Sequence, residues 1–204
     1  MINYFHKYGN REEGILNHWI DSNPWIKDVL VEYKIDHTPY HDWKMDIDYN
    51  GEILNFTIHI KEEEIYWYEK TGNLGLDFIS AFYFKRPEYK IDLVKNNYCI
   101  NSSQIENFLN NQITVSKWGK LYTCDSNIHI FYVEDKFCRA YSNNKLKSKE
   151  MINYLKLNYK LRVNKKNEYG LSDDWESAAF FVKPNDLELK KCEINTLKEL
   201  ILTY

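Results

Sequence analysis

Residues 46–80 read DIDYNGEILNFTIHIKEEEIYWYEKTGNLGLDFIS, and this stretch decides the expected fold. Apolar and polar residues alternate along two runs, 44–49 and 53–61, which are separated by Asn50 and Gly51. Alternation with a period of two predicts strands. An Asn-Gly pair tolerates the positive φ angles of a two-residue hairpin turn. The sequence therefore predicts that these two runs form a β-hairpin.

A third strand is predicted at 74–84, after Thr71-Gly72-Asn73, which we expect to form a tight turn. Further strands are expected at 29–35, 120–124, 128–133 and 137–141, and an apolar run follows at 178–182. Helices are expected where apolar residues follow helical spacing, several of them behind a capping serine: 10–22, 102–111, 148–159, a short one from Ser172, and 194–202. These elements predict an α/β or α+β fold, a single domain over residues 1–204 with a central mixed β-sheet flanked by helices.

Composition limits the class of protein. The chain has 204 residues, 44% of them apolar, and its four cysteines form no C-x-x-C pair. Scattered cysteines favour reduced, structural thiols. The first ten residues do not resemble a signal peptide, and no apolar run approaches the ~20 residues of a membrane helix. We therefore expect a cytoplasmic, soluble protein that does not enter a membrane.

The net charge of −3 conceals a basic segment at 136–166, which contains ten Lys and Arg residues and one acidic residue, Glu150. Such a block can follow a nucleic-acid backbone, or it can be an ordinary solvated face. The candidates for nucleic-acid binding are Lys145, Lys147, Lys149, Lys156, Lys160, Arg162, Lys165 and Lys166.

The predicted hairpin carries polar residues in a suggestive order. Asp46 and Asp48 lie on one face of its first strand, and its second strand ends in His59-Ile60-Lys61. An acidic residue before a turn, followed by a strand that ends in x-x-Lys, resembles the metal site of the PD-(D/E)XK nuclease superfamily. The following Thr71-Gly72-Asn73 resembles a segment of phage and plasmid members. The resemblance covers about residues 42–160 and implies a restriction-endonuclease-like core.

The resemblance implies a metal-dependent nucleic-acid phosphodiesterase, an endo- or exonuclease, with Mg²⁺ or Mn²⁺ as cofactor. Asp46 or Asp48 would bind the metal and Lys61 would assist the nucleophile. Asp46 is favoured, because 42–46 resembles the family's segment. His59 stands where the family has an acid. The site is then inactive, uses a transition metal such as Mn²⁺, or takes its missing carboxylate from elsewhere, with Asp77 as the best donor.

Other readings stay open. His37, His41 and Asp42 offer metal ligands in a predicted loop, but too few for tetrahedral zinc. The sequence contains no G-x-x-x-x-G-K-[ST], G-x-S-x-G or H-E-x-x-H motif, so nucleotide-binding, serine-hydrolase and zincin functions lack their usual support. The alternative function is a catalytically inactive nuclease-like binding protein, such as a phage-encoded inhibitor of a host nucleic-acid system. Partners would be DNA, RNA or another protein, and a homodimer is also considered.

Overall fold

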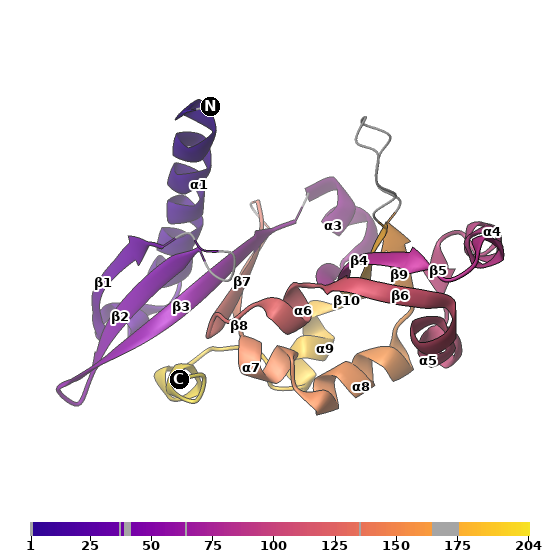
Figure 1. Cartoon of the computed structure of the whole chain (residues 1–204). Coiled ribbons are helices and arrows are strands. Elements are labelled where there is room, and N and C mark those ends of the chain that lie inside the picture. Colours follow the sequence, from indigo (N-terminus) through magenta and orange to yellow (C-terminus); the bar gives the residue numbers. More distant parts are fainter. Residues whose placement is uncertain (1, 37, 39–41, 64, 135, 165–175) are drawn as a thin grey trace. The chain divides into compact units, whose positions relative to one another are not determined.

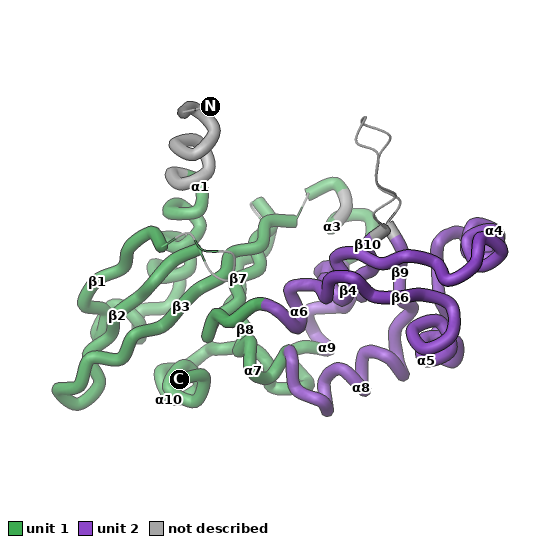
Figure 2. Tube along the Cα trace, viewed as in Figure 1, with its two compact units in different colours: residues 1–72, 124–146, 187–204 green, residues 73–123, 147–186 purple. Residues whose placement is uncertain are grey.

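The computed structural model describes residues 2–36, 38, 42–63, 65–134, 136–164 and 176–204 (Figure 1). The chain divides into two compact units (Figure 2). Unit 1 contains residues 1–72, 124–146 and 187–204, and unit 2 contains residues 73–123 and 147–186. The segments of the two units alternate along the chain. The single domain over residues 1–204 stays a prediction.

Unit 1 is built on a five-stranded mixed sheet in the order β1-β2-β3-β7-β8. Strands β3 and β7 run parallel, and the other neighbouring pairs are antiparallel. The bounds of the strands are β1 (Leu30–Ile35), β2 (Trp43–Tyr49), β3 (Glu52–Glu62), β7 (Ile128–Val133) and β8 (Phe137–Ser142).

The β2–β3 hairpin turns at Asn50 and Gly51, which have φ angles of 55° and 85°. Positive φ at both central positions matches the right-handed twist of the two strands. The side chain of Asp48 supports the turn, because its Oδ1 accepts a hydrogen bond from the Gly51 amide at 2.8 Å. The predicted hairpin is confirmed.

One face of this sheet is apolar and forms the core of unit 1 with α1. Leu16 and Trp19 of α1 are buried together with Met45, Phe56 and Ile58 of the sheet. The predicted apolar stripe of the first helix is thus confirmed. The helices of unit 1 are α1 (Ile2–Asp21), α2 (Pro24–Lys27), α3 (Ile65–Thr71), α7 (Asn143–Leu146) and α10 (Leu197–Ile201), and α9 (Pro184–Leu189) passes from unit 2 into unit 1.

Unit 2 contains a second sheet of five strands, all antiparallel, in the order β5-β9-β10-β4-β6. Phe78 and Phe180 face each other across β4 and β10 with ring centroids 4.9 Å apart. The strands are β4 (Leu74–Phe84), β5 (Cys99–Ile100), β6 (Ile113–Trp118), β9 (Leu161–Asn164) and β10 (Glu176–Val182). The helices are α4 (Pro87–Lys95), the 3-10 turn η1 (Ser102–Gln104), α5 (Ile105–Asn107), the π-helical η2 (Phe108–Gln112), α6 (Lys120–Thr123) and α8 (Lys149–Asn158).

The predicted α/β class, with a mixed sheet flanked by helices, is confirmed. The helix predicted behind Ser148 is α8, and Ser148 Oγ accepts the Met151 amide as an N-cap. The strand predicted at 120–124 is wrong, because these residues form the helical turn α6. The helix predicted from Ser172 begins outside the described residues.

Candidate active site

The face of the unit 1 sheet that points away from α1 carries polar side chains. Side chains alternate along a strand, so residues 44, 46, 57, 59 and 61 share this face while their neighbours enter the core. The parallel partner strand β7 adds His129, which lies directly beside His59 in the register. These residues are the candidates for a functional site on this face.

Asp42 and His59 form a hydrogen-bonded pair on this face. Asp42 extends the ladder between β2 and β3 by one position, since its amide donates to the Ile58 carbonyl at 2.8 Å. It therefore lies opposite His59, and its Oδ2 is 2.7 Å from His59 Nδ1. The same oxygen accepts the Ile60 amide at 2.8 Å. A carboxylate can only accept, so His59 carries its proton on Nδ1 and Nε2 becomes its basic nitrogen.

A second histidine fixes the other side of the His59 ring. The rings of His59 and His129 meet edge to face with centroids 4.8 Å apart. His129 stacks on Phe131 at 4.5 Å and is only 5% exposed. The side chain of His59 itself is 13% exposed. His59 is therefore held from two directions and still reaches solvent, which suits a group that transfers protons.

Lys61 lies two positions after His59 on the same face of β3, a separation of about 7 Å along the strand. Its Nζ is 3.6 Å from Oε1 of Glu63, and the two side chains are 20% and 12% exposed. The Lys61 side chain thus shares a strand face with His59, and its ammonium group lies beside the Glu63 carboxylate. The placement of His59 and Lys61 on one face follows from their two-residue spacing in a strand.

The structure does not bring Asp46 to Lys61. Asp46 lies opposite Asn55, whose Nδ2 donates to Asp46 Oδ1 at 2.8 Å. Lys61 is six positions further along β3, which corresponds to about 20 Å at the usual rise of a strand. Asp48 lies still nearer the hairpin turn, which it supports. The assignment of Asp46 or Asp48 to a site with Lys61 is therefore corrected, because both carboxylates serve the other end of the hairpin.

Asp77, the predicted replacement ligand, belongs to unit 2, where it lies on β4 opposite Ala179. Within the ranges that the structure describes, no three His, Cys, Asp or Glu side chains gather as ligands for one metal ion. Mg²⁺ and Mn²⁺ prefer oxygen ligands and are usually held by one or two carboxylates, with water completing the shell. At this site the Oδ2 atom of Asp42 is already engaged by His59 Nδ1 and by the Ile60 amide. The residues at Asp42 and His59 do not fit the divalent-metal site that the resemblance implies.

The predicted basic segment is divided between the units. Lys145 lies on α7 in unit 1, and its Nζ donates to the Lys191 carbonyl at 2.6 Å. Residues 147–164 belong to unit 2. Lys165 and Lys166 lie outside the described residues. The segment is therefore not one continuous patch on one unit.

Within unit 2, two of the candidate basic side chains make contacts of their own. Lys156 Nζ is 2.7 Å from Glu106 Oε1, and the Arg162 guanidinium lies over the Phe181 ring at 5.8 Å. Lys149 at the start of α8 and Lys160 after its end are exposed, and Lys147 is partly buried. Arg162 is also exposed. Contact of Lys149, Lys160 and Arg162 with a phosphate backbone stays a prediction.

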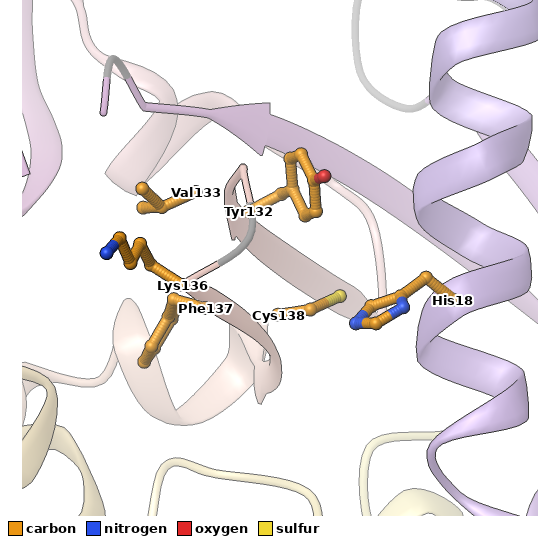
Figure 3. Close-up of a pocket in the computed structure, with 6 residues that line it drawn as sticks. All are labelled: His18, Tyr132, Val133, Lys136, Phe137 and Cys138. Atoms are coloured by element: carbon orange, nitrogen blue, oxygen red, sulfur yellow. The ribbon is translucent and has the colours of Figure 1, made fainter. Parts of the chain in front are cut away.

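A cavity of about 410 Å³ lies elsewhere in unit 1, between α1 and the β7–β8 hairpin (Figure 3). The sulfur of Cys138 points toward the ring of His18, and no predicted site residue lines the cavity. Burial raises the pKa of the Cys138 thiol to about 12. A thiol that stays protonated is a poor nucleophile, so burial opposes nucleophilic chemistry at Cys138. The lining residues are His18, Tyr132, Val133, Lys136, Phe137 and Cys138.

Sequence reasoning missed the role of Asp42 and of His129. The signal for Asp42 was present in the hairpin turn, because residues equally distant from Asn50-Gly51 must face each other. In the observed register the numbers of paired residues add to 101, which matches 42 with 59. His129 had no such local signal, because the parallel pairing of β3 with β7 joins segments about 70 residues apart.

No described helix combines the length and hydrophobicity that crossing a lipid bilayer requires. We compared the chain with protein-family models, with curated proteins and with solved structures, and none of these comparisons found a match.

Proposed function

We propose that this chain is a nucleic-acid phosphodiesterase that uses His59 as general base and Lys61 as the group that stabilises the phosphate. The observation that carries the proposal is the 2.7 Å contact between Asp42 Oδ2 and His59 Nδ1, with Lys61 two positions along the same strand face. The expected nuclease activity is retained in this proposal, but its chemistry is reassigned from a metal to side chains.

Each residue has a defined task. Asp42 holds the imidazole in the tautomer whose Nε2 accepts a proton, and the Ile60 amide holds Asp42 in place. A positioned histidine contributes about 10²- to 10⁴-fold to a reaction by proton transfer. The Lys61 ammonium offsets the negative charge that develops on the phosphoryl oxygens in the transition state. In this proposal, proton transfer and charge stabilisation are both carried out by side chains of the protein.

The substrate class that fits this set is RNA. His59 would remove the proton of a ribose 2′-hydroxyl, and the 2′-oxygen would form a bond to the adjacent phosphorus. The bond from phosphorus to the 5′-oxygen breaks, and the leaving oxygen takes a proton from solvent. The products are a 2′,3′-cyclic phosphate and a 5′-hydroxyl. DNA lacks the internal nucleophile, so its hydrolysis would need an activated water that these residues are less suited to supply.

The test is cleavage of a labelled RNA oligonucleotide in EDTA by wild type, by His59→Gln and by Lys61→Met. We expect His59→Gln to lower the rate by about 10²-fold or more. Lys61→Met nearly keeps the length of the side chain and removes its charge. Any fall in its cleavage rate therefore measures the contribution of the charge. Lys44→Met is the matched control, because Lys44 lies on the same sheet face, paired with Asp36 at 2.6 Å, and should leave the rate unchanged.

The substrate itself provides a second control. A single 2′-deoxy nucleotide at the scissile position should block cleavage at that bond only. Cleavage that requires Mg²⁺ or Mn²⁺ and survives His59→Gln would contradict the assignment and return the choice to a metal-dependent site. In that case Asp42 and Glu63, the carboxylates that contact His59 and Lys61, should be substituted next.

A second candidate is a binding protein with no catalysis, as an inactive relative of nucleases would be. The pairing of Lys61 with Glu63, both largely buried, favours it because the carboxylate reduces the charge that Lys61 offers to a phosphate. This protein would bind RNA or DNA in EDTA and cleave neither with any metal. Binding should weaken with salt, and loss of Lys149 or Lys160 should lower the salt slope by about one each.

A further inference from the structure

Among the residues that the structure describes, strand β1 is the outermost strand of the unit 1 sheet, and β2 is its single neighbour in the strand order. Figure 1 shows β1 at the outer side of the sheet, followed inward by β2 and β3. An outermost strand presents unpaired backbone groups along its free edge and can add another strand there. The chemistry of this edge decides which strand it would accept.

The direction of the backbone groups in β1 follows from its ladder with β2. The Asp36 amide donates to the Asp42 carbonyl at 2.9 Å, and this pair continues the register in which Ile35 lies opposite Trp43. Hydrogen-bonded positions alternate along an antiparallel pair. Lys34 and Glu32 therefore turn their backbone groups toward β2, whereas Ile35 and Tyr33 turn theirs toward the free edge.

The side chains of β1 divide between the two faces of the sheet. The Tyr33 hydroxyl donates to Asn17 Oδ1 of α1 at 2.6 Å, so Tyr33 lies on the α1 face. Glu32 and Lys34 lie on the opposite face, where their charged atoms are 3.7 Å apart. Val31 and Ile35, one toward each end of the strand, are 55% and 50% exposed although both are apolar. The strand thus combines one acid, one base and two exposed apolar residues around a central tyrosine.

We propose that β1 pairs with β1 of a second copy of this chain, in an antiparallel arrangement centred on Tyr33. In this register Glu32 lies opposite the partner's Lys34, and Lys34 lies opposite the partner's Glu32. Val31, which lies at the register shift between Leu30 and Glu32, approaches the partner's Ile35, and the contact covers both exposed apolar side chains. Tyr33 lies opposite the partner's Tyr33, and each donates its amide to the other's carbonyl. The two charge pairs occupy non-hydrogen-bonded positions, where opposed side chains come closest.

The charges also exclude the neighbouring registers. A shift that centres the pair on Lys34 brings two lysines together, and a shift that centres it on Glu32 brings two glutamates together. A shift by a single residue sets outward-pointing backbone groups against inward-pointing ones. Charged residues on an edge strand often prevent pairing, but here the two charges have opposite signs and are symmetric about Tyr33. The edge is therefore complementary to itself in one register.

The interface is small. One pair of six-residue strands covers less than the ~800 Å² per partner of a standard protein interface. We expect a reversible dimer with a dissociation constant in the micromolar range. Sedimentation velocity over a concentration series measures this constant on the full chain, whose mass is 24.7 kDa.

The charge pattern provides the decisive variants. Glu32→Lys makes the edge entirely basic and Lys34→Glu makes it entirely acidic, so each variant alone should dissociate about tenfold or more readily than wild type. An equimolar mixture of the two should dimerise, because every pair then joins opposite charges. The double variant Glu32→Lys/Lys34→Glu should dimerise like wild type. Glu52→Lys, at an exposed position of the β2–β3 hairpin, is the control and should not change the constant.

Two results would overturn the proposal. The first is a wild-type chain that stays monomeric up to high micromolar concentration. The second is a wild-type dimer that both single variants preserve, or that the mixture of folded variants fails to restore. Circular dichroism establishes that each variant is folded. If a single variant does not fold, the double variant still decides, since loss of its dimer contradicts the charge pairing.

Discussion

A methyl group added at Gly119 would collide with the backbone of the neighbouring strand. Gly119 joins β6 to α6 in unit 2, and a Cβ atom built there would lie 2.2 Å from the Asp77 carbonyl oxygen and 2.5 Å from the Asp77 carbonyl carbon. It would also lie 2.8 Å from the carbonyl carbon of Phe78. These are backbone atoms of β4, so no side-chain rotation can make room. Gly119→Ala therefore has to move α6 away from β4 by roughly 1 Å.

The loss of stability can be estimated from the hydrogen bond and the ring contacts that this movement weakens. The Gly119 amide donates to the Phe78 carbonyl at 3.0 Å, and a typical hydrogen bond contributes about 1 kcal/mol net. Phe78 also packs on Trp118 and Tyr122, with ring centroids 5.8 and 5.4 Å apart. Such ring pairs add about 0.5–1.5 kcal/mol each. With the strain of overpacking included, Gly119→Ala should lower the free energy of unfolding by about 2–4 kcal/mol.

Urea denaturation, followed by near-ultraviolet circular dichroism of the tryptophans and by far-ultraviolet circular dichroism, measures this loss. Gly14→Ala is the matched control, because the same methyl group meets nothing within 4 Å on helix α1. In a helix interior it should stabilise the protein by up to about 1 kcal/mol. Equal stability of wild type and Gly119→Ala would refute the close approach of Gly119 to β4, and with it the packing of α6.

Two further predictions concern stability. Asn143→Ala should lower the free energy of unfolding by about 2 kcal/mol, because the buried Asn143 amide donates to the carbonyls of Cys124 and Ser126 at 2.7 and 2.9 Å. Asn144→Ala, at an exposed position, should change the free energy of unfolding little. The urea midpoints of the two variants test this difference. Burial raises the pKa of the Cys138 thiol from 9.0 to about 12. The stability that its protonated form contributes is complete below pH 9.0 and is lost as the pH rises to about 12. The part of the thiolate absorbance that a Cys138→Ser variant lacks should therefore appear near pH 9.0 in urea and only near pH 12 in the folded protein.

The hairpin and the first helix could be predicted because their signals are local. Asn50-Gly51 fixes a turn, and the alternation on either side fixes which residues enter the core. The stripe of apolar residues on α1 needs a partner surface, which the apolar face of the hairpin supplies. Such short-range patterns specify elements and faces without any knowledge of the rest of the chain.

The second sheet could not be predicted in the same way. We expected the strand at 74–84 to join the sheet of the hairpin, but α3 intervenes and β4 pairs with β6 and β10 in unit 2. The partner β10 lies about 100 residues away in the sequence. The segment 120–124 has strand-forming residues, yet Gly119 accepts the amides of Tyr122 and Thr123 and closes a helical turn. Tertiary packing overrides propensity in both cases.

The assignment of Asp46 shows how spacing along a chain differs from spacing in a hairpin. A count of residues from Asp46 to Lys61 takes no account of the turn between them, although the turn determines which residues meet. Once Asn50-Gly51 is accepted as the turn, the residue opposite His59 must be Asp42, and Asp46 must lie near the far end. A carboxylate beside the motif lysine is thus present, but it holds an imidazole. The strand position that a metal ligand would occupy carries a histidine. In the function that we propose, the chemistry therefore changes from metal-bound water to a base that activates the substrate's own hydroxyl.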